Sequence, residues 1–104
     1  MCGIGGFSGE FPRPLLGAMN RAIAHRGPDD AGELWLEGER VGLCHRRLSI
    51  IDLSPLGHQP MWDVERRAAI VFNGEIYNYR ELRRELEARG CRFAGASDTE
   101  VLLN

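Results

Sequence analysis

The second residue of the chain, Cys2, combines two groups that could carry out acyl transfer. Removal of the initiator Met1, which a small second residue permits, leaves the Cys2 thiol beside its own free α-amino group. An α-amino group has a pKa of about 7.7 to 8.0, so an appreciable fraction is unprotonated at neutral pH and can accept the thiol proton. The glycine-rich stretch that follows favours a closely packed strand rather than a frayed terminus. Cys2 is therefore a candidate nucleophile that needs no histidine as its base.

The dipeptide Asn73-Gly74 could stabilise the oxyanion that such a reaction forms. It follows an apolar run over 68–72 that predicts a strand buried on both faces. An asparagine amide and a glycine backbone N–H are both suitable donors to a tetrahedral intermediate. Asn-Gly also forms hairpin turns, but the next residues, Glu75 to Asn78, lead into a predicted helix and not into a pairing strand. We interpret Asn73 and Gly74 as candidate oxyanion donors.

Arg47 and Asp98 would suit the two charged ends of a free amino acid. A guanidinium presents a planar fork to a carboxylate, and a carboxylate can accept hydrogen bonds from an ammonium group. Each residue alone is more often a solvated or paired surface charge. Their interpretation as substrate-binding residues depends on their occurrence together with Cys2, Asn73 and Gly74.

The composition fits one domain and excludes several classes of partner. A chain of 104 residues with 43% apolar residues can form one core and is too short for two. The 13 basic residues, all arginine, face 15 acidic ones, and a net charge of −2 does not favour nucleic acid or an anionic membrane. The arginines over 80–89 alternate with glutamates, as on an exposed helix face. We predict no nucleic-acid partner and no membrane partner.

The cysteines and the N-terminus indicate a reducing compartment. Cys2, Cys44 and Cys91 are odd in number and lack the paired spacing of a disulfide framework, so we predict free thiols, with Cys44 as a small apolar residue in a strand. The apolar runs are far shorter than the roughly 20 residues of a membrane helix. The first dozen residues do not resemble a secretion signal. We predict a cytoplasmic protein.

The three histidines do not predict a metal centre. His25, His45 and His58 are widely separated in sequence, and Cys44 and His45, as neighbours in a predicted strand, would point to opposite faces. We predict that the chain binds no metal. We expect His25 and His45 to form ordinary hydrogen bonds that hold loops near the site.

Hydrophobic periodicity and turn residues predict mixed helices and strands. Strands are predicted over 3–8, 32–37, 40–45, 68–72 and around 91–93, and helices from Pro14 to near His25, between Asn78 and Gly90, and onward from Ser97. Asn78 and Ser97 are predicted N-caps, and Gly38 suits a tight hairpin between the second and third strands. The turn-rich loop over 54–60 has a composition that often lines a site. This alternation predicts an α+β or layered α/β fold that is incomplete at its C-terminal side.

Aromatic side chains offer a further candidate for binding, which we set aside. The residues concerned are Trp35, Trp62, Tyr77 and Tyr79. Large aromatic side chains usually pack in the core. We expect all of these side chains to be packing groups.

A series of ordered motifs spans the entire chain. The motifs are Met1-Cys2-Gly3-Ile4, His25-Arg26-Gly27-Pro28-Asp29, His45-Arg46-Arg47-Leu48-Ser49-Ile50-Ile51-Asp52, Gln59-Pro60-Met61, Phe72-Asn73-Gly74-Glu75-Ile76-Tyr77-Asn78 and Ser97-Asp98-Thr99-Glu100-Val101. Together they resemble the motifs of the class II glutamine amidotransferases, which are N-terminal-nucleophile hydrolases. Within that class they are most similar to the glutaminase domain of glutamine-hydrolysing asparagine synthetases.

The resemblance implies glutamine hydrolysis at Cys2. The thiol would attack the side-chain amide of L-glutamine, release ammonia and leave a γ-glutamyl thioester that water hydrolyses. The resemblance places Asn73 and the Gly74 N–H at the oxyanion, Arg47 on the substrate α-carboxylate, and Glu75 and Asp98 around the α-ammonium. One wall of the substrate site would consist of Arg47, Leu48, Ser49, Ile50 and Ile51.

The same resemblance implies a fold and a larger assembly. The fold would be a four-layer αββα sandwich of two antiparallel sheets, of the N-terminal-nucleophile hydrolase type and incomplete in this chain. Residues 1–104 would form the N-terminal part of the glutaminase domain. No Ser-Gly-Gly-x-Asp pyrophosphate loop occurs in the sequence, so the synthetase domain is expected to be absent.

In the complete enzyme, ammonia would pass to that C-terminal synthetase domain. There ATP and magnesium would activate aspartate, whereas no cofactor is expected in this chain, and the full-length enzyme would form a homodimer. Two alternatives stay open from the sequence. One is a non-catalytic glutamine-sensing module, and the other is an amidotransferase that modifies polysaccharides or peptides.

Overall fold

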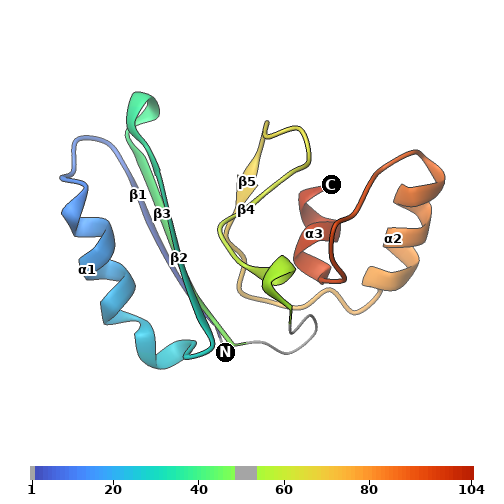
Figure 1. Cartoon of the computed structure of the whole chain (residues 1–104), viewed down its shortest axis with the longest axis horizontal. Helices are drawn as coiled ribbons and strands as arrows, with labels where there is room; N and C mark the ends of the chain where they lie inside the picture. Colours follow the sequence, from blue (N-terminus) through green and yellow to red (C-terminus); the bar gives the residue numbers. More distant parts are fainter. Residues whose placement is uncertain (1, 49–53) are drawn as a thin grey trace.

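A three-stranded antiparallel sheet occupies the first half of the computed structural model, which describes residues 2–48 and 54–104 (Figure 1). Its strands are β1 (Gly3–Ser8), β2 (Asp30–Leu36) and β3 (Val41–Arg47), with β3 in the centre. Gly3 pairs with Arg46 and Ser8 with Val41 along β1 and β3. These strands confirm the three that the sequence predicts for this half. The register brings Cys2, the residue before β1, to the end of β3.

The hairpin between β2 and β3 is present as predicted, but the role predicted for Gly38 is wrong. The turn is a 3₁₀ turn over Glu37–Glu39, and the left-handed residue is Arg40, with φ of 53°. Gly38 is not the residue that reverses the chain, and open space surrounds it. A 3₁₀ turn keeps its own residues in right-handed helical conformations, so the reversal falls on the residue that follows it.

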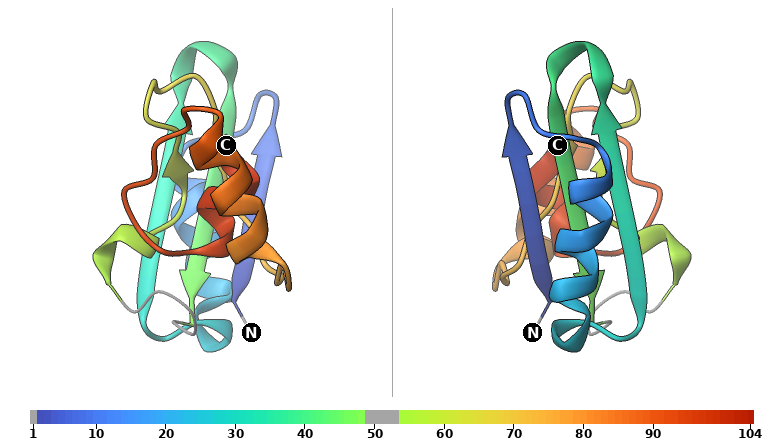
Figure 2. Two further views of the ribbon diagram at one scale, coloured as in Figure 1. Left: turned by 90° about the vertical axis from the view of Figure 1, so that its right-hand side faces the viewer. Right: turned by 90° about the vertical axis from the view of Figure 1, so that its left-hand side faces the viewer.

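The helix α1 (Pro14–Ala22) covers one face of the sheet, as the two views of Figure 2 show. It begins with proline in its first turn, as predicted, and continues into a 3₁₀ turn over Ala24–Arg26. Gly5 makes this packing possible, since a Cβ there would lie 2.9 Å from Cys44 Sγ and 3.4 Å from Met19 Cε. Cys44 is fully buried in this layer, as expected for a small apolar residue.

The second half of the chain lies on the other side of the sheet. It contains the two-stranded antiparallel sheet of β4 (Met61–Trp62) and β5 (Ala69–Ile70), followed by α2 (Tyr79–Ala88) and α3 (Asp98–Leu103). Along the long axis of the molecule, Figure 1 shows α1, the three-stranded sheet, β4 with β5, then α3 and α2. The class is therefore α+β with antiparallel sheets. Among the described residues, no helix is long and apolar enough to cross a membrane.

Of two strand predictions for the second half, one is confirmed only in part and the other is wrong. The apolar run over 68–72 forms only the short strand β5, whose residues are half-buried and which pairs with β4 alone in the described structure. Residues 91–93 form no strand in the described chain. Instead, the Arg83 guanidinium on α2 lies 4.6 Å from the centre of the Phe93 ring and donates a hydrogen bond to the Gly95 carbonyl. Phe93 therefore packs against a helix and not into a sheet.

The predicted positions of the helix ends are confirmed for α2 and α3. The Ser97 side chain accepts a hydrogen bond from the Glu100 N–H and caps α3, as predicted. α2 begins after Asn78, although the Asn78 side chain makes no capping hydrogen bond to the described residues. Gly90, just beyond α2, has φ of +93°, the left-handed conformation that commonly ends a helix.

The two halves approach closely at Gly32, and we predict that Gly32→Ala destabilises the fold. A Cβ there would overlap the Gln59 carbonyl oxygen and lie 2.8 Å from His58 Nε2. Overpacking of this kind typically costs about 1–3 kcal/mol of the free energy of unfolding, measured by urea denaturation. Gly38→Ala is the matched control and should change that free energy by less than about 0.5 kcal/mol. Equal effects of both substitutions would contradict this packing.

Candidate active site

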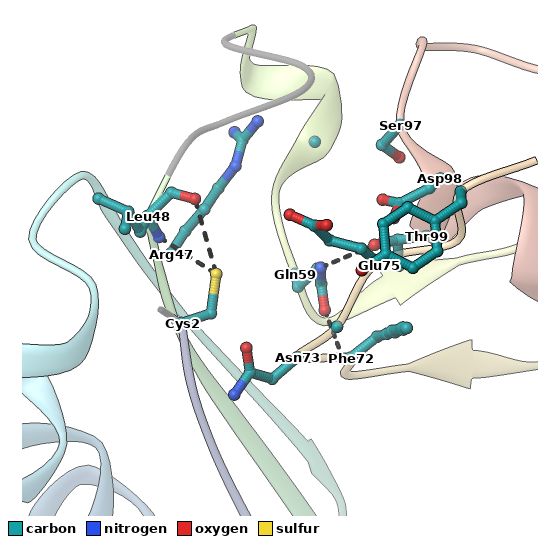
Figure 3. A pocket seen from close by; sticks show the side chains of 13 residues that line it. Cys2, Arg47, Leu48, Gln59, Phe72, Asn73, Glu75, Ser97, Asp98 and Thr99 are labelled. Atoms are coloured by element: carbon teal, nitrogen blue, oxygen red, sulfur yellow. Dashed lines mark hydrogen bonds between the residues drawn. The ribbon is translucent and has the colours of Figure 1, made fainter. Parts of the chain in front are cut away.

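A pocket of about 370 Å³ lies between the three-stranded sheet and the second half of the chain (Figure 3). Its walls come from the end of β3, the loop before β4, the segment after β5 and the start of α3. The lining residues are Cys2, Arg47, Leu48, Gly57, Gln59, Phe72, Asn73, Gly74, Glu75, Tyr77, Ser97, Asp98 and Thr99. Residues that are far apart in the sequence therefore meet in one cavity.

The Cys2 thiol is held at the rim of this pocket by the main chain of Leu48. The Leu48 N–H donates to Cys2 Sγ at 3.3 Å, and the thiol lies 3.6 Å from the Leu48 carbonyl oxygen as a donor. Cys2 is half-buried. The pairing of β1 with β3 fixes this contact, because it brings the start of one strand beside the end of the other.

The Arg47 guanidinium is fixed at the end of β3. Its Nη1 donates to the Ser54 carbonyl at 2.7 Å, and the side chain is almost fully buried. Gly57 lies directly against the guanidinium, so that any Cβ at this position would overlap Nη2. The missing side chain at Gly57 therefore makes room for a charged group that would otherwise be displaced.

The residues Asn73 and Gly74 are exposed to the pocket, and their position is set through the preceding residue, Phe72. The Phe72 N–H donates to Gln59 Oε1 at 2.7 Å, and the Phe72 carbonyl lies 3.3 Å from His45 Nε2. Figure 3 shows the Asn73 carboxamide extending toward the strand that carries Cys2. The chain continues from Gly74 to α2, so the dipeptide is not the turn of a hairpin.

The acidic residues of the pocket lie near the start of α3. Asp98, the first residue of that helix, is buried, and its Oδ2 accepts a hydrogen bond from the Ile76 N–H at 3.0 Å. Glu75 is exposed and also lines the pocket. Arg47 supplies positive charge on the opposite wall. The cavity thus presents both signs of charge, which suits a zwitterionic ligand.

Two histidines lie beside the pocket. His45 is 1% exposed, and its Nδ1 has no hydrogen-bond partner among the described residues. Burial lowers the pKa of His45, and this effect outweighs the hydrogen bond to Phe72, which raises it. His58 forms a hydrogen bond to Asp30. Burial alone would raise the pKa of the Asp30 carboxyl. The hydrogen bonds that this carboxyl makes with His58 and with the Ala31 N–H outweigh burial, and the pKa of Asp30 is lowered.

The structure brings most of the predicted site residues together. Those that line the pocket are Cys2, Arg47, Leu48, Asn73, Gly74, Glu75 and Asp98. The predicted wall residues Ser49, Ile50 and Ile51 lie outside the described residues.

Sequence reasoning does not single out six of the lining residues as site residues, which are Gly57, Gln59, Phe72, Tyr77, Ser97 and Thr99. The first two belong to the loop over 54–60, whose composition predicts that it lines a site. Gln59 and Thr99 belong to recognisable motifs, but no spacing rule identifies two side chains that bond to each other across 40 positions. Tyr77 is 93% exposed and lines the pocket, so its prediction as a packing group is wrong. It follows Ile76 in an irregular segment before α2, where no regular periodicity directs it into the core.

Of the two histidines expected to hold loops, His45 contacts Phe72 and His25 is exposed.

The family model of the glutamine amidotransferase domain matches residues 1–104, and the chain therefore belongs to this family. An asparagine synthetase (glutamine-hydrolyzing) of Bacillus subtilis is 48% identical, over 99% of this chain and 17% of the relative. A putative asparagine synthetase of Methanocaldococcus jannaschii is 43% identical, over 99% of this chain and 23% of the relative. The amidase chry2 of Gibberella zeae is 39% identical, over 99% of this chain and 17% of the relative. The chain thus spans only about a fifth of the length of these proteins.

The buried His45 predicts a loss of stability on mild acidification. In the unfolded chain a histidine takes up a proton as the pH falls through about 6.5, whereas the lowered pKa of the folded state delays that uptake. The unfolded state then binds more protons, so the free energy of unfolding decreases as the pH falls below about 6.5. His45→Gln, which can still donate to the Phe72 carbonyl, should weaken this dependence in urea denaturation between about pH 7.5 and 5.5.

His25→Gln is the matched control, since His25 is exposed. It should keep the pH dependence of the unmodified protein. If the free energy of unfolding depends on pH equally in His45→Gln and in the unmodified protein, the buried neutral imidazole is not the source of that dependence.

Proposed function

We propose that this chain hydrolyses the side-chain amide of L-glutamine, with Cys2 as the nucleophile. The observation that carries the proposal is the meeting of Cys2, Asn73 and Gly74 in one pocket whose walls also include Arg47 and Asp98. A nucleophile, two oxyanion donors and charges of both signs are the groups that an amidohydrolase of a free amino acid needs. Membership in the glutamine amidotransferase domain family supports the same reaction.

The first half of the reaction forms a covalent intermediate at Cys2. After removal of Met1, the α-amino group of Cys2 accepts the thiol proton, and Sγ attacks the side-chain carbonyl carbon of glutamine. The carbonyl oxygen becomes an oxyanion and accepts hydrogen bonds from the Asn73 side-chain amide and the Gly74 N–H. Collapse of this tetrahedral intermediate breaks the C–N bond. The ammonium at Cys2 returns its proton to the leaving nitrogen, so that ammonia departs and a γ-glutamyl thioester remains.

The second half repeats the same roles with water. The α-amino group of Cys2 takes a proton from water, which attacks the thioester carbonyl and forms a second oxyanion at Asn73 and Gly74. Collapse of this intermediate breaks the C–S bond, releases glutamate and restores the thiol. Arg47 holds the α-carboxylate throughout, and Asp98 with Glu75 holds the α-ammonium, which directs the amide toward Cys2.

The ammonia has a proposed use in a larger protein. Because asparagine synthetases match this chain over 99% of its length, we propose that a synthetase region uses the ammonia in the ATP-dependent conversion of aspartate to asparagine. In this proposal the described layers are part of a four-layer αββα sandwich. The free thiols fit action in the cytoplasm. Ammonia channelling and homodimerisation stay predictions.

A second candidate acceptor rests on a different relative. The amidase chry2 of Gibberella zeae matches the chain at 39% identity over 99% of its length. The glutaminase residues could therefore serve an amidotransferase of another pathway, in which ammonia reaches an acceptor other than aspartate. Both candidates require turnover of glutamine, whereas a glutamine-sensing module would bind glutamine without releasing ammonia.

Asn73→Ala tests the proposed oxyanion site. In the complete protein it should lower glutamine-dependent turnover by roughly 10²-fold or more, because one oxyanion donor is lost. Activity with added ammonia should be retained, since ammonia bypasses Cys2. Both activities are measured by product formation under the same conditions. Full glutamine-dependent turnover in Asn73→Ala would contradict the assignment, and an equal loss of both activities would indicate misfolding.

A further inference from the structure

The buried side chain of Gln59 connects two parts of the pocket wall, and we propose that it is a positioning residue for the oxyanion donors. This inference rests on the proposed glutaminase function. It assigns Gln59 the role of linking Asn73 and Gly74 to the start of α3, where Asp98 would hold the amino end of the substrate.

Gln59 has both ends of its carboxamide engaged. The side chain is 6% exposed. Its Oε1 accepts from the Phe72 N–H at 2.7 Å, and its Nε2 donates to Thr99 Oγ1 at 3.2 Å, as the dashed lines in Figure 3 show. A buried amide that is satisfied at both ends has a single favourable orientation, because any other orientation leaves polar atoms unpaired. The Gln59 side chain can therefore fix the position of the Phe72 N–H relative to Thr99 Oγ1.

The segment over 72–76, which carries the oxyanion donors and Glu75, is tied at both ends to the start of α3. At its far end, the Ile76 N–H donates to Asp98 Oδ2 at 3.0 Å. At its near end, the Phe72 N–H is linked to Thr99 through the Gln59 side chain. Asp98 and Thr99 are the first two residues of α3. The connection at Ile76 is a direct hydrogen bond to Asp98, whereas the connection at Phe72 depends on the Gln59 carboxamide.

The main chain of Phe72 is also the point where this segment meets the strand next to Cys2. The Phe72 carbonyl lies 3.3 Å from His45 Nε2, on β3. With Gln59 in place, Phe72 is held through its N–H and through its carbonyl immediately before Asn73. Without Gln59, the carbonyl contact would be the one main-chain hydrogen bond that Phe72 keeps among the described residues. The Asn73 amide and the Gly74 N–H would then be less well aligned with the oxyanion, and misplacement by about 1 Å can cost roughly 10²-fold in rate.

The test is Gln59→Leu in the complete protein as the cell produces it, with turnover expressed per Cys2 site. A diazo-ketone analogue of glutamine that alkylates Cys2 counts the competent sites, so a fraction of misfolded protein does not enter the rate. We expect kcat per site to fall about 10-fold or more and KM for glutamine to change less than about 3-fold. In an Asn73→Ala background, the same substitution should cost clearly less than in the unmodified protein, because one of the two donors that Gln59 positions is already removed.

Asn20→Leu is the matched control. The Asn20 carboxamide is also buried and bonded, with Nδ2 near the Gly32 carbonyl and Oδ1 accepting from Arg46, but it lies on the α1 side of the sheet. It should reduce stability without changing kcat per site. Gln59→Glu should restore most of the rate lost in Gln59→Leu, since a carboxylate still accepts from the Phe72 N–H and the Thr99 hydroxyl can donate to it.

Several results would overturn the inference. An unchanged kcat per site in Gln59→Leu would do so. Full multiplication of the losses caused by Gln59→Leu and Asn73→Ala would also do so, because it would show that Gln59 does not act through Asn73. If Gln59→Leu yields no competent sites, Thr99→Val replaces it, with a smaller loss of kcat and the same weak effect in the Asn73→Ala background. An unmodified protein that neither releases ammonia nor reacts at Cys2 would defeat the proposed function itself.

Discussion

The antiparallel pairing of β1 with β3 is the interaction on which the rest of the site depends. It places Cys2 beside the main chain of Leu48 and next to the buried Arg47. Successive residues of a strand point to opposite faces, so a slip of one position would turn the pocket-facing residues of β3 toward α1. The close fit of Gly5 against Cys44 and Met19 opposes such a slip, because only glycine leaves room there. The position of the thiol is thus a consequence of packing on the far face of the sheet.

Contacts between the two halves of the chain complete the pocket. His45 on β3 reaches the Phe72 carbonyl, and Gly32 on β2 lets the backbone of Gln59 lie against the sheet. These contacts join a rigid sheet to an irregular segment that has little regular structure of its own. The segment after β5 can present exposed donors because buried polar groups behind it fix its backbone. In this arrangement the donors in the pocket depend on buried residues that carry no chemistry themselves.

Much of this architecture could be predicted from the sequence, and the failures have a common cause. The strands of the first half, α1, α2 and the Ser97 cap arise from local periodicity and capping, and these local signals are reliable here. The run over 68–72 forms only the two-residue strand β5, which pairs with β4 alone among the described residues, and Phe93 packs against Arg83 of α2 instead of joining a sheet. Local propensity cannot distinguish these cases.

The candidate site divides in the same way. Cys2, Asn73 and Gly74 could be identified because their chemical groups and sequence neighbours already suggest acyl transfer. The composition of the loop over 54–60 indicates that it lines a site, but Gln59 and Thr99 could not be singled out, because each is an ordinary polar residue whose importance comes from a contact across the fold.

The measurement that most directly tests the central claim is mass spectrometry of the protein quenched in acid during glutamine turnover. The account predicts a chain that begins at Cys2 and carries one glutamyl group on the Cys2 sulfur, and no such group in Cys2→Ala. A fully active protein that retains Met1, or a glutamyl group found on another residue, would contradict it.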